Sequence, residues 1–439
     1  MCQLTKRMEK TMRTPKLDEN TKSVPKRRLA TKLMLVMLPI AVLGSGAASA
    51  DWNFDPVLRA AWDIDDNATL STRTDDEVEL SGYMAEASLD LIYTSERSFL
   101  SMRPMVRTRD YGNEPDEEDW NTDDEFFDIL GSYEGDKNSF RIFADISRES
   151  VRTAELADAD LDTEIDPDDI ADDQSGFVTN QRRDRYRITP RWTHRFSGVS
   201  SIETDLSYLT TSYEETDDLF SLFDFTDIRL RIGYRRYFSE QNSAVFWIGA
   251  RDYDTDRFAG DRKTYEVSGG FVRRLSETTQ FRALVGLESV DEEDVGLPTV
   301  SIDPQATAEI SLSQQLKTIR LFAQYRKRVN ASGRGSLTSR DELNLRFSRD
   351  LNDRVTVGLG ARAYKTETVS GINNTQDFVQ IRGQVVWRIS PAFSMQTDYR
   401  HTVIDRGLFD GAADSSRITV WLSYRPIPVG REDRLRVQF

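Results

Sequence analysis

The sequence predicts an all-β protein: a transmembrane, antiparallel, up-and-down β-barrel of about 18 strands, with short periplasmic turns and long extracellular loops. Three observations support this prediction. Polar and apolar residues alternate with a period of two along nearly the whole chain after residue 50, and tight turns alternate with longer connections. No apolar stretch after residue 50 reaches the ~20 residues that a spanning helix needs, so a membrane protein with this sequence must be a closed barrel.

The composition is polar for a membrane protein. Of the 439 residues, 38% are hydrophobic and 30% are charged, and the mean hydropathy is -0.56. In a membrane barrel only alternate residues of each strand face lipid, so a low mean hydropathy is expected. The chain contains no linker rich in Gly, Ser or Pro and no change of period. We therefore expect two parts, a signal peptide over 1–50 and an outer-membrane β-barrel over 51–439.

The first 50 residues have the features of a secretory signal. Basic residues within 22–32 precede an apolar run over 33–43, and a small-residue motif ends at Ala50, which predicts cleavage after that residue. A transmembrane anchor is the alternative, but the run is well short of about 20 residues. The only cysteine, Cys2, lies in the segment removed. The mature chain would thus have no disulfide, thiolate metal site or cysteine nucleophile.

The stretch from Arg183 to Ser212 shows the alternation most clearly. In its first half every second position is Arg or Thr, with mainly apolar residues between them. A tight turn in the middle would set Arg191 opposite Asp205 and Trp192 opposite Thr204, which keeps each face continuous across the hairpin.

The same two-faced pattern predicts the other strands. In order, we expect strands at Asn53–Ile64, Glu79–Ser95, Phe99–Tyr111, Glu125–Glu134, Phe140–Ser150, Arg183–Phe196, Ser201–Tyr213, Phe225–Phe238, Ala244–Tyr253, Thr264–Leu275, Gln280–Glu288, Thr307–Leu316, Thr318–Val329, Glu342–Leu351, Arg354–Thr366, Asp377–Ile389, Ala392–Ile404 and Ser416–Arg425. The number is even, as bacterial single-chain barrels require. Every second connection is tight, and the longer ones include Val151–Arg182, Ser289–Gln305 and Asn330–Arg340.

The C-terminus carries a candidate assembly signal. Phe439, with Leu435 and Val437 at alternate positions before it, resembles the terminal signal that the barrel-assembly machinery reads. Pro426 and Pro428 separate it from the preceding strand, and proline cannot donate within a ladder. Residues 435–439 could therefore form a short closing extension instead of the end of a full strand, and the pairing of the closing seam stays open.

If the aromatic and aliphatic positions of each strand face lipid, a set of arginines faces the lumen. The predicted pore-lining residues are Arg185, Arg187, Arg191, Arg195, Arg229, Arg231, Arg235, Arg320, Arg326, Arg346, Arg382 and Arg388. One interpretation is an anion-attracting wall, because rings of side chains set pore selectivity. The other is structural, because arginine pairs well with carboxylates. For any single arginine we favour an ion pair with a carboxylate, and the candidate partners are Glu203, Asp205, Glu266, Glu309 and Asp398. For the set as a whole we favour a lumen with a net positive charge.

The net charge is -16, so the acidic residues must lie elsewhere, and they gather in the predicted loops. The largest cluster includes Asp158, Asp160, Asp162, Asp166, Asp168 and Asp169. The alternating aspartates over 158–162 resemble the start of a calcium loop, but Thr163 stands where that loop needs glycine. We favour a solvated acidic loop that faces lipopolysaccharide, and no metal site is predicted.

Catalysis is not expected. The chain has two histidines: His194 lies beside a tight turn and His401 near a long loop, so they belong at opposite rims, about 25 Å apart. Gly-rich phosphate loops, zinc spacings and nucleic-acid modules are absent from the sequence, so we expect no cofactor and no nucleic-acid partner.

The layout of signal peptide, bare barrel of about 18 strands and terminal Phe resembles the β-barrel porin-2 group. Members of that group are associated with exopolysaccharide and capsule export loci. The resemblance implies a protein of the Gram-negative outer membrane whose partners are outer-membrane lipid, lipopolysaccharide and the barrel-assembly machinery. The expected function is a channel for anionic solutes or an exopolysaccharide. The alternative is a non-channel structural or surface-binding barrel with acidic extracellular loops.

Overall fold

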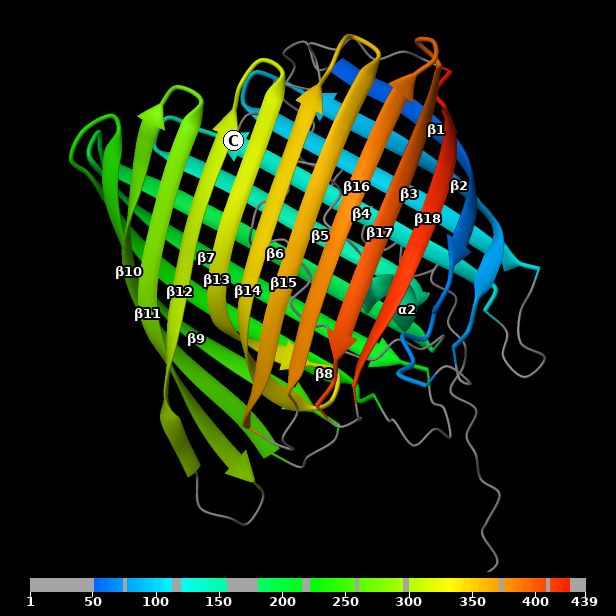
Figure 1. Ribbon diagram of the computed structural model, residues 1–439. Coiled ribbons are helices and arrows are strands. Elements are labelled where there is room, and N and C mark those ends of the chain that lie inside the picture. Colours follow the sequence, from blue (N-terminus) through cyan, green and yellow to red (C-terminus); the bar gives the residue numbers. More distant parts are fainter. Residues whose placement is uncertain are drawn as a thin grey trace, which may run out of the picture. The chain divides into compact units, whose positions relative to one another are not determined.

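The computed structural model describes residues 51–73, 77–112, 120–155, 181–214, 222–256, 260–294, 300–370, 375–407 and 411–426. These residues form one 18-stranded antiparallel sheet in which each strand pairs with its neighbours along the chain (Figure 1). The first strand, β1, also pairs with the last, β18, so the sheet closes into a barrel. The predicted fold class is confirmed.

The strands, in order, are β1 (Asp51–Asp65), β2 (Leu80–Thr94), β3 (Ser98–Tyr111), β4 (Thr122–Glu134), β5 (Asn138–Ser150), β6 (Arg182–Ser197), β7 (Ser200–Tyr213), β8 (Phe225–Tyr237), β9 (Asn242–Thr255), β10 (Gly260–Ser276), β11 (Thr279–Asp294), β12 (Val300–Gln315), β13 (Ile319–Ser332), β14 (Ser336–Asp350), β15 (Val355–Ser370), β16 (Gln376–Arg388), β17 (Phe393–Asp405) and β18 (Ala412–Tyr424). A single helical turn, α2 (Val151–Glu155), follows β5. No helix among these residues is long and apolar enough to cross a membrane.

The register of the β6–β7 hairpin agrees with the prediction from its alternation. Arg191 lies opposite Asp205, and Trp192 lies opposite Thr204. Since the side-chain period of a strand is two, this register sends the arginines and the aromatic residues of β6 to opposite faces.

Three expected long connections differ from the structure. Most of Ser289–Gln305 continues the β11 and β12 strands around a β-bulge, because backbone pairing does not need an apolar face. Asn330–Arg340 is mainly strand as well, and β13 turns into β14 at residues 333–335, where Gly335 has a φ of 71°. Val151–Arg182 begins with α2.

The two faces of the wall have opposite chemistry. Large apolar side chains, such as Val285, Leu359 and Ile381, are more than half exposed on the outside. Polar and charged side chains, such as Arg187 and Glu342, are buried inside. This arrangement is the reverse of that in a water-soluble protein, and it is the arrangement of an outer-membrane barrel, whose outward band contacts lipid.

Candidate functional site: an arginine-rich lumen

Strand parity turns every predicted pore-lining arginine inward, because the large apolar residues of the same strands occupy the outward positions. Arg185, Arg187 and Arg326 are buried. Half-buried side chains make up most of the remainder, namely Arg191, Arg229, Arg231, Arg235, Arg320, Arg346 and Arg382. Arg195 and Arg388 lie at the tight-turn end, where they are exposed.

The five carboxylates named from the sequence all take part in ion pairs with arginines. On the wall from β6 to β10, Arg191 and Arg231 both donate to Asp205, over 2.9 and 3.0 Å. The other pairs are Arg235 with Glu203 at 2.6 Å, Arg229 with Glu266, Arg282 with Glu309 at 3.2 Å, and Arg382 with Asp398 at 2.8 Å. Paired guanidinium groups lose rotational freedom, so the arginine rows have a fixed geometry.

The wall from β1 to β5 holds further inward carboxylates that the sequence interpretation did not single out. They include Asp63, Glu86, Asp145 and Glu149, all of them buried. Asp124, which we expected in an acidic loop, is also buried and lies within β4. Their signal in the sequence was the alternation, which gives them inward parity; in the structure Glu86 lies directly opposite Arg107, and Asp145 lies directly opposite Arg187. Each opposed pair also forms an ion pair.

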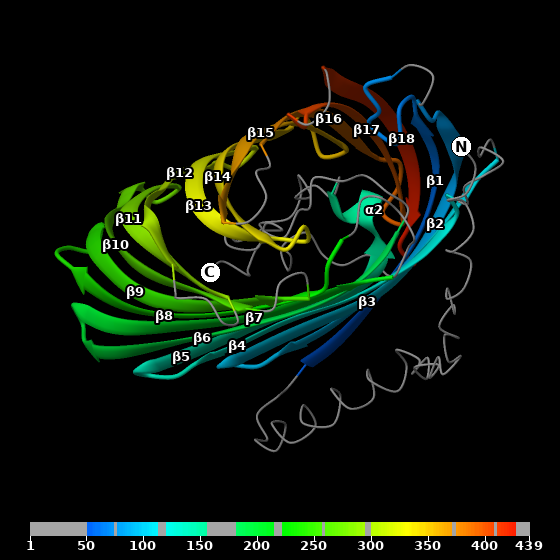
Figure 2. The same cartoon turned by 90° about the horizontal axis from the view of Figure 1, so that it is seen from below.

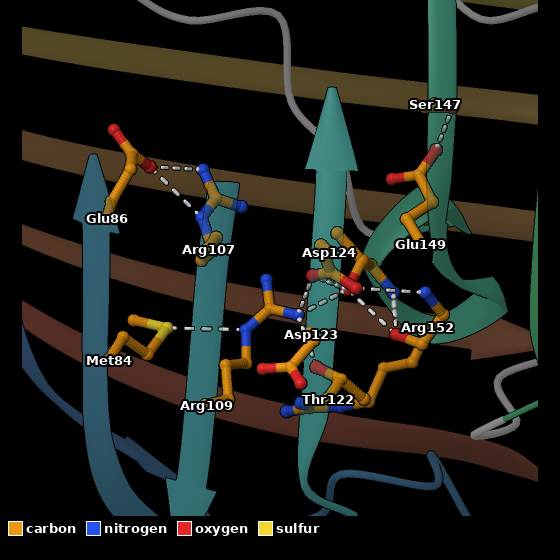
Figure 3. A network of polar contacts seen from close by, with 12 residues as sticks. Met84, Glu86, Arg107, Arg109, Thr122, Asp123, Asp124, Ser147, Glu149 and Arg152 are labelled. Atoms are coloured by element: carbon orange, nitrogen blue, oxygen red, sulfur yellow. Dashed lines mark hydrogen bonds and ion pairs between the residues drawn. The ribbon is translucent and has the colours of Figure 1, made fainter. Parts of the chain in front are cut away.

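Helix α2 lies against this acidic wall, as Figure 3 shows. Arg109 of β3 donates to Asp124 over 2.5 Å and to the Thr153 hydroxyl of α2 over 2.6 Å. From α2, Arg152 donates to Asp65 of β1 and to the Tyr111 hydroxyl of β3. These bonds hold the helical turn inside the ring of strands (Figure 2).

The tip of the β13–β14 hairpin also enters the lumen (Figure 2). Its backbone carbonyls accept hydrogen bonds from β9: Arg251 donates to Val329 over 2.8 Å, and the Tyr253 hydroxyl donates to Ser332 over 3.0 Å. Leu337 is fully buried in an apolar cluster that includes Tyr253. The hairpin therefore occupies part of the lumen and contacts strands that are not its neighbours in the sheet.

A cavity lies between the hairpin and the arginine rows. Its lining includes Arg185, Arg187, Arg191, Asp205, Asp227, Arg229, Arg231, Arg251, Arg328 and Asn330. Arginines outnumber aspartates in this lining. Asp227 forms a two-point pair with Arg251, at 2.5 and 3.1 Å, so this arginine is fixed as well. Such a cavity can hold an anion close to several guanidinium groups.

The histidines are far apart along the chain and make separate contacts. His194 hydrogen-bonds with Asn138 over 2.8 Å beside the β6–β7 turn, and His401 hydrogen-bonds with Ser416 over 3.1 Å. Among the described residues there is no group of three or more His, Cys, Asp or Glu side chains that could hold a metal ion. The signal peptide, the acidic cluster at 158–169 and Phe439 lie outside the described residues.

Comparisons with known proteins add a fold-level likeness. No family model and no curated protein matches the chain. Solved structures that it resembles are the Pseudomonas aeruginosa outer membrane protein OpdK, solved with vanillate (11% identity, TM-score 0.43), and P. aeruginosa OccK9, also called OpdG (12%, 0.44). A BenF-like porin from Pseudomonas fluorescens Pf-5 is similar at 10% identity and a TM-score of 0.43. Each likeness covers 85% of this chain and 98% of the other.

Proposed function

We propose that this outer-membrane barrel is a channel that favours small anionic solutes. The observation that carries the proposal is the cavity beside the β13–β14 hairpin, into which arginines of β6, β8 and β9 project. Side chains that line a narrow passage set its ion selectivity, and low-dielectric walls strengthen their field. The cavity lining contains fewer carboxylates than arginines, so the passage carries a net positive charge.

Planar-bilayer recordings of the refolded protein test the proposal. Under a potassium chloride gradient, an anion-preferring channel gives a reversal potential toward the chloride equilibrium potential. Arg231→Gln should move that potential in the cation direction, because it removes one charge from the cavity. Arg236→Gln is the matched control: this arginine is on the same strand, but it is exposed on the outward face. Cation selectivity of the unmodified channel would overturn the proposal.

A small solute fits the lumen better than a polymer does. Both α2 and the β13–β14 hairpin occupy space inside the ring of strands, and a polysaccharide would have to pass both. If the barrel is a channel, the alternative to small solutes is the export of an anionic exopolysaccharide. A soluble polyuronate distinguishes the two: it should block small-ion current without entering vesicles, whereas its uptake would favour export.

The alternative function is that of a barrel that does not conduct, and the same recordings test it. The many inward ion pairs give this alternative its physical basis, since a network of pairs can seal a lumen. A refolded protein without conductance would support a structural or surface-binding role.

A further inference from the structure

The cavity beside the β13–β14 hairpin contains a polar group that the proposed function does not use. Asn330 of β13 lines this cavity and is only 2% exposed. Its side-chain nitrogen is buried and has no hydrogen-bond partner among the residues that the structure describes. Nearly all buried polar groups of native proteins are hydrogen-bonded, so this amide indicates a partner that the described residues do not supply.

Contacts with the barrel wall fix the backbone on both sides of this amide. The carbonyl of Val329 accepts a hydrogen bond from Arg251 over 2.8 Å, and the carbonyl of Ser332 accepts one from the Tyr253 hydroxyl over 3.0 Å. The backbone of Asn330 itself belongs to the β13–β14 ladder. The freedom that remains is rotation of the side chain, and the terminal torsion of asparagine is broad. The amide can therefore turn its N–H groups toward a ligand in the cavity while the hairpin stays in place.

Charged donors line the other side of the cavity. Arginines of β6, β8 and β9 project into it from the wall, whereas Asn330 belongs to the hairpin inside the lumen (Figure 2). Arg191 and Arg231 are held by Asp205, over 2.9 and 3.0 Å. A guanidinium group has five N–H donors, so an arginine that pairs with a carboxylate can also donate to an anion. A ligand in the cavity therefore meets donors on two sides, cationic on one and neutral on the other.

The size of the cavity limits the ligand. Its volume is about 80 Å³. Since one water molecule needs ~10 to 15 Å³, the cavity holds roughly five to eight of them. A small inorganic oxoanion such as sulfate or phosphate is of this size, whereas an aromatic acid or a sugar residue is larger.

The placement of the donors favours a tetrahedral ion. A carboxylate carries its two oxygens on one side of the molecule, so the rest of that molecule would face either the arginines or Asn330. A tetrahedral oxoanion carries oxygens in all directions, and it can accept hydrogen bonds from the wall and from the hairpin at once. Hydrogen bonds between guanidinium groups and oxyanions are charge-assisted and roughly twice as strong as neutral ones. The arginines thus supply most of the affinity, and Asn330 supplies the discrimination between ion shapes.

We propose that this cavity is a binding site for a tetrahedral inorganic oxoanion of the sulfate or phosphate type, and that Asn330 is its specificity-determining residue. The inference rests on the proposed function, because the ion reaches the cavity along the lumen. The bound ion accepts hydrogen bonds from the wall arginines and from the Asn330 amide, which gives the buried donor its partner. It also links the hairpin to the wall of the barrel.

Isothermal titration calorimetry of the refolded barrel in detergent tests the site. Sulfate and phosphate are the probes, and malonate is the control, because it is a dianion like sulfate but carries its charge on carboxylates. Sulfate and phosphate should each bind several-fold more tightly than malonate. Equal affinities for sulfate and malonate would overturn the proposal, and so would the absence of sulfate binding. Calorimetry needs no ion flow, so a barrel that does not conduct still tests this inference, and an anion-selective barrel that does not bind sulfate refutes it alone.

Removal of the amide tests the role of the asparagine. Asn330→Leu keeps the branched shape of the side chain but has no donors, so its sulfate affinity should fall several-fold while its malonate affinity stays the same. Asn344→Leu is the matched control, because Asn344 of β14 is also buried but does not line the cavity. An unchanged sulfate affinity in Asn330→Leu would refute the assignment.

Hydrogen exchange of the unmodified chain gives a second measurement, which decides if Asn330→Leu does not fold. A bound ion that links the hairpin to the wall should slow the exchange of the backbone amides of residues 328–332. Sulfate should therefore protect these amides more than malonate does at the same concentration. Equal protection by the two ions would contradict the proposed site.

Discussion

Arg191 and Asp205 face each other across the β6–β7 ladder, and the Arg191 Nε donates to the Asp205 Oδ1 over 2.9 Å. The second oxygen of the same carboxylate accepts from Arg231 of β8. One buried aspartate therefore joins three consecutive strands from inside the lumen. Its negative charge also holds two guanidinium groups at the wall of the cavity.

Replacing this aspartate should destabilise the barrel. Asp205→Ala leaves two arginines close together without their shared partner, and loss of one member of a buried ion pair costs about 3 to 5 kcal/mol. The midpoint of urea unfolding in phosphatidylcholine vesicles measures the effect. Asp136→Ala is the control, because that aspartate is exposed in a turn and its pair with Arg97 should contribute only about 0 to 1 kcal/mol. Equal midpoints for the two variants would contradict the structural role.

Release of the β13–β14 hairpin should widen the channel. Leu337 is fully buried in the apolar cluster that holds the hairpin tip, so Leu337→Asp would place an unpaired carboxylate there. We expect a larger single-channel conductance and a weaker anion preference, since Arg328 would leave the cavity lining. Leu337→Met keeps the volume and should leave both quantities unchanged. An unchanged conductance in the Asp variant would show that the hairpin does not limit the passage.

Alternation was sufficient to predict the wall of the barrel. A period of two determines which side chains face lipid, and a tight turn determines the register, so the opposition of Arg191 and Asp205 followed from the sequence. Alternation also gives Asp145 the parity of the other lumen residues. Its position opposite Arg187 could not be predicted in the same way, because a long connection and not a tight turn joins β5 to β6.

Elements that fold into the lumen could not be predicted in this way. Helix α2 is one turn long, too short to show a helical period, and its position depends on bonds to residues as distant in the chain as Asp65. The β13–β14 tip contains small polar residues and two glycines, which are typical of an exposed loop. Its burial depends on contacts with Arg251 and Tyr253, and no local pattern encodes these.

Cleavage of the signal remains a prediction that the N-terminal sequence of the mature protein can test. We expect the mature chain to begin at Asp51, the first residue of β1. Ala50→Arg should block cleavage, because the site requires a small residue, and precursor should accumulate. Asp51→Ala, one residue further on, should leave processing intact. A mature N-terminus well inside β1 would contradict the assignment of residues 51–57 to the barrel.

The lipid-facing assignment predicts a cost that depends on depth in the membrane. Leu359 is exposed on the outside of β15, four residues in from its turn end and therefore inside the lipid-facing band, so Leu359→Arg should destabilise the folded barrel by about 2 to 4 kcal/mol. The same change at Phe238, beside the tight turn after β8, should cost only about 0 to 1 kcal/mol, because a charge at the interface can reach water. Urea unfolding of both variants in phosphatidylcholine vesicles measures the difference. Equal costs would mean that Leu359 does not lie inside the lipid-facing band, because a water-exposed wall would tolerate either arginine.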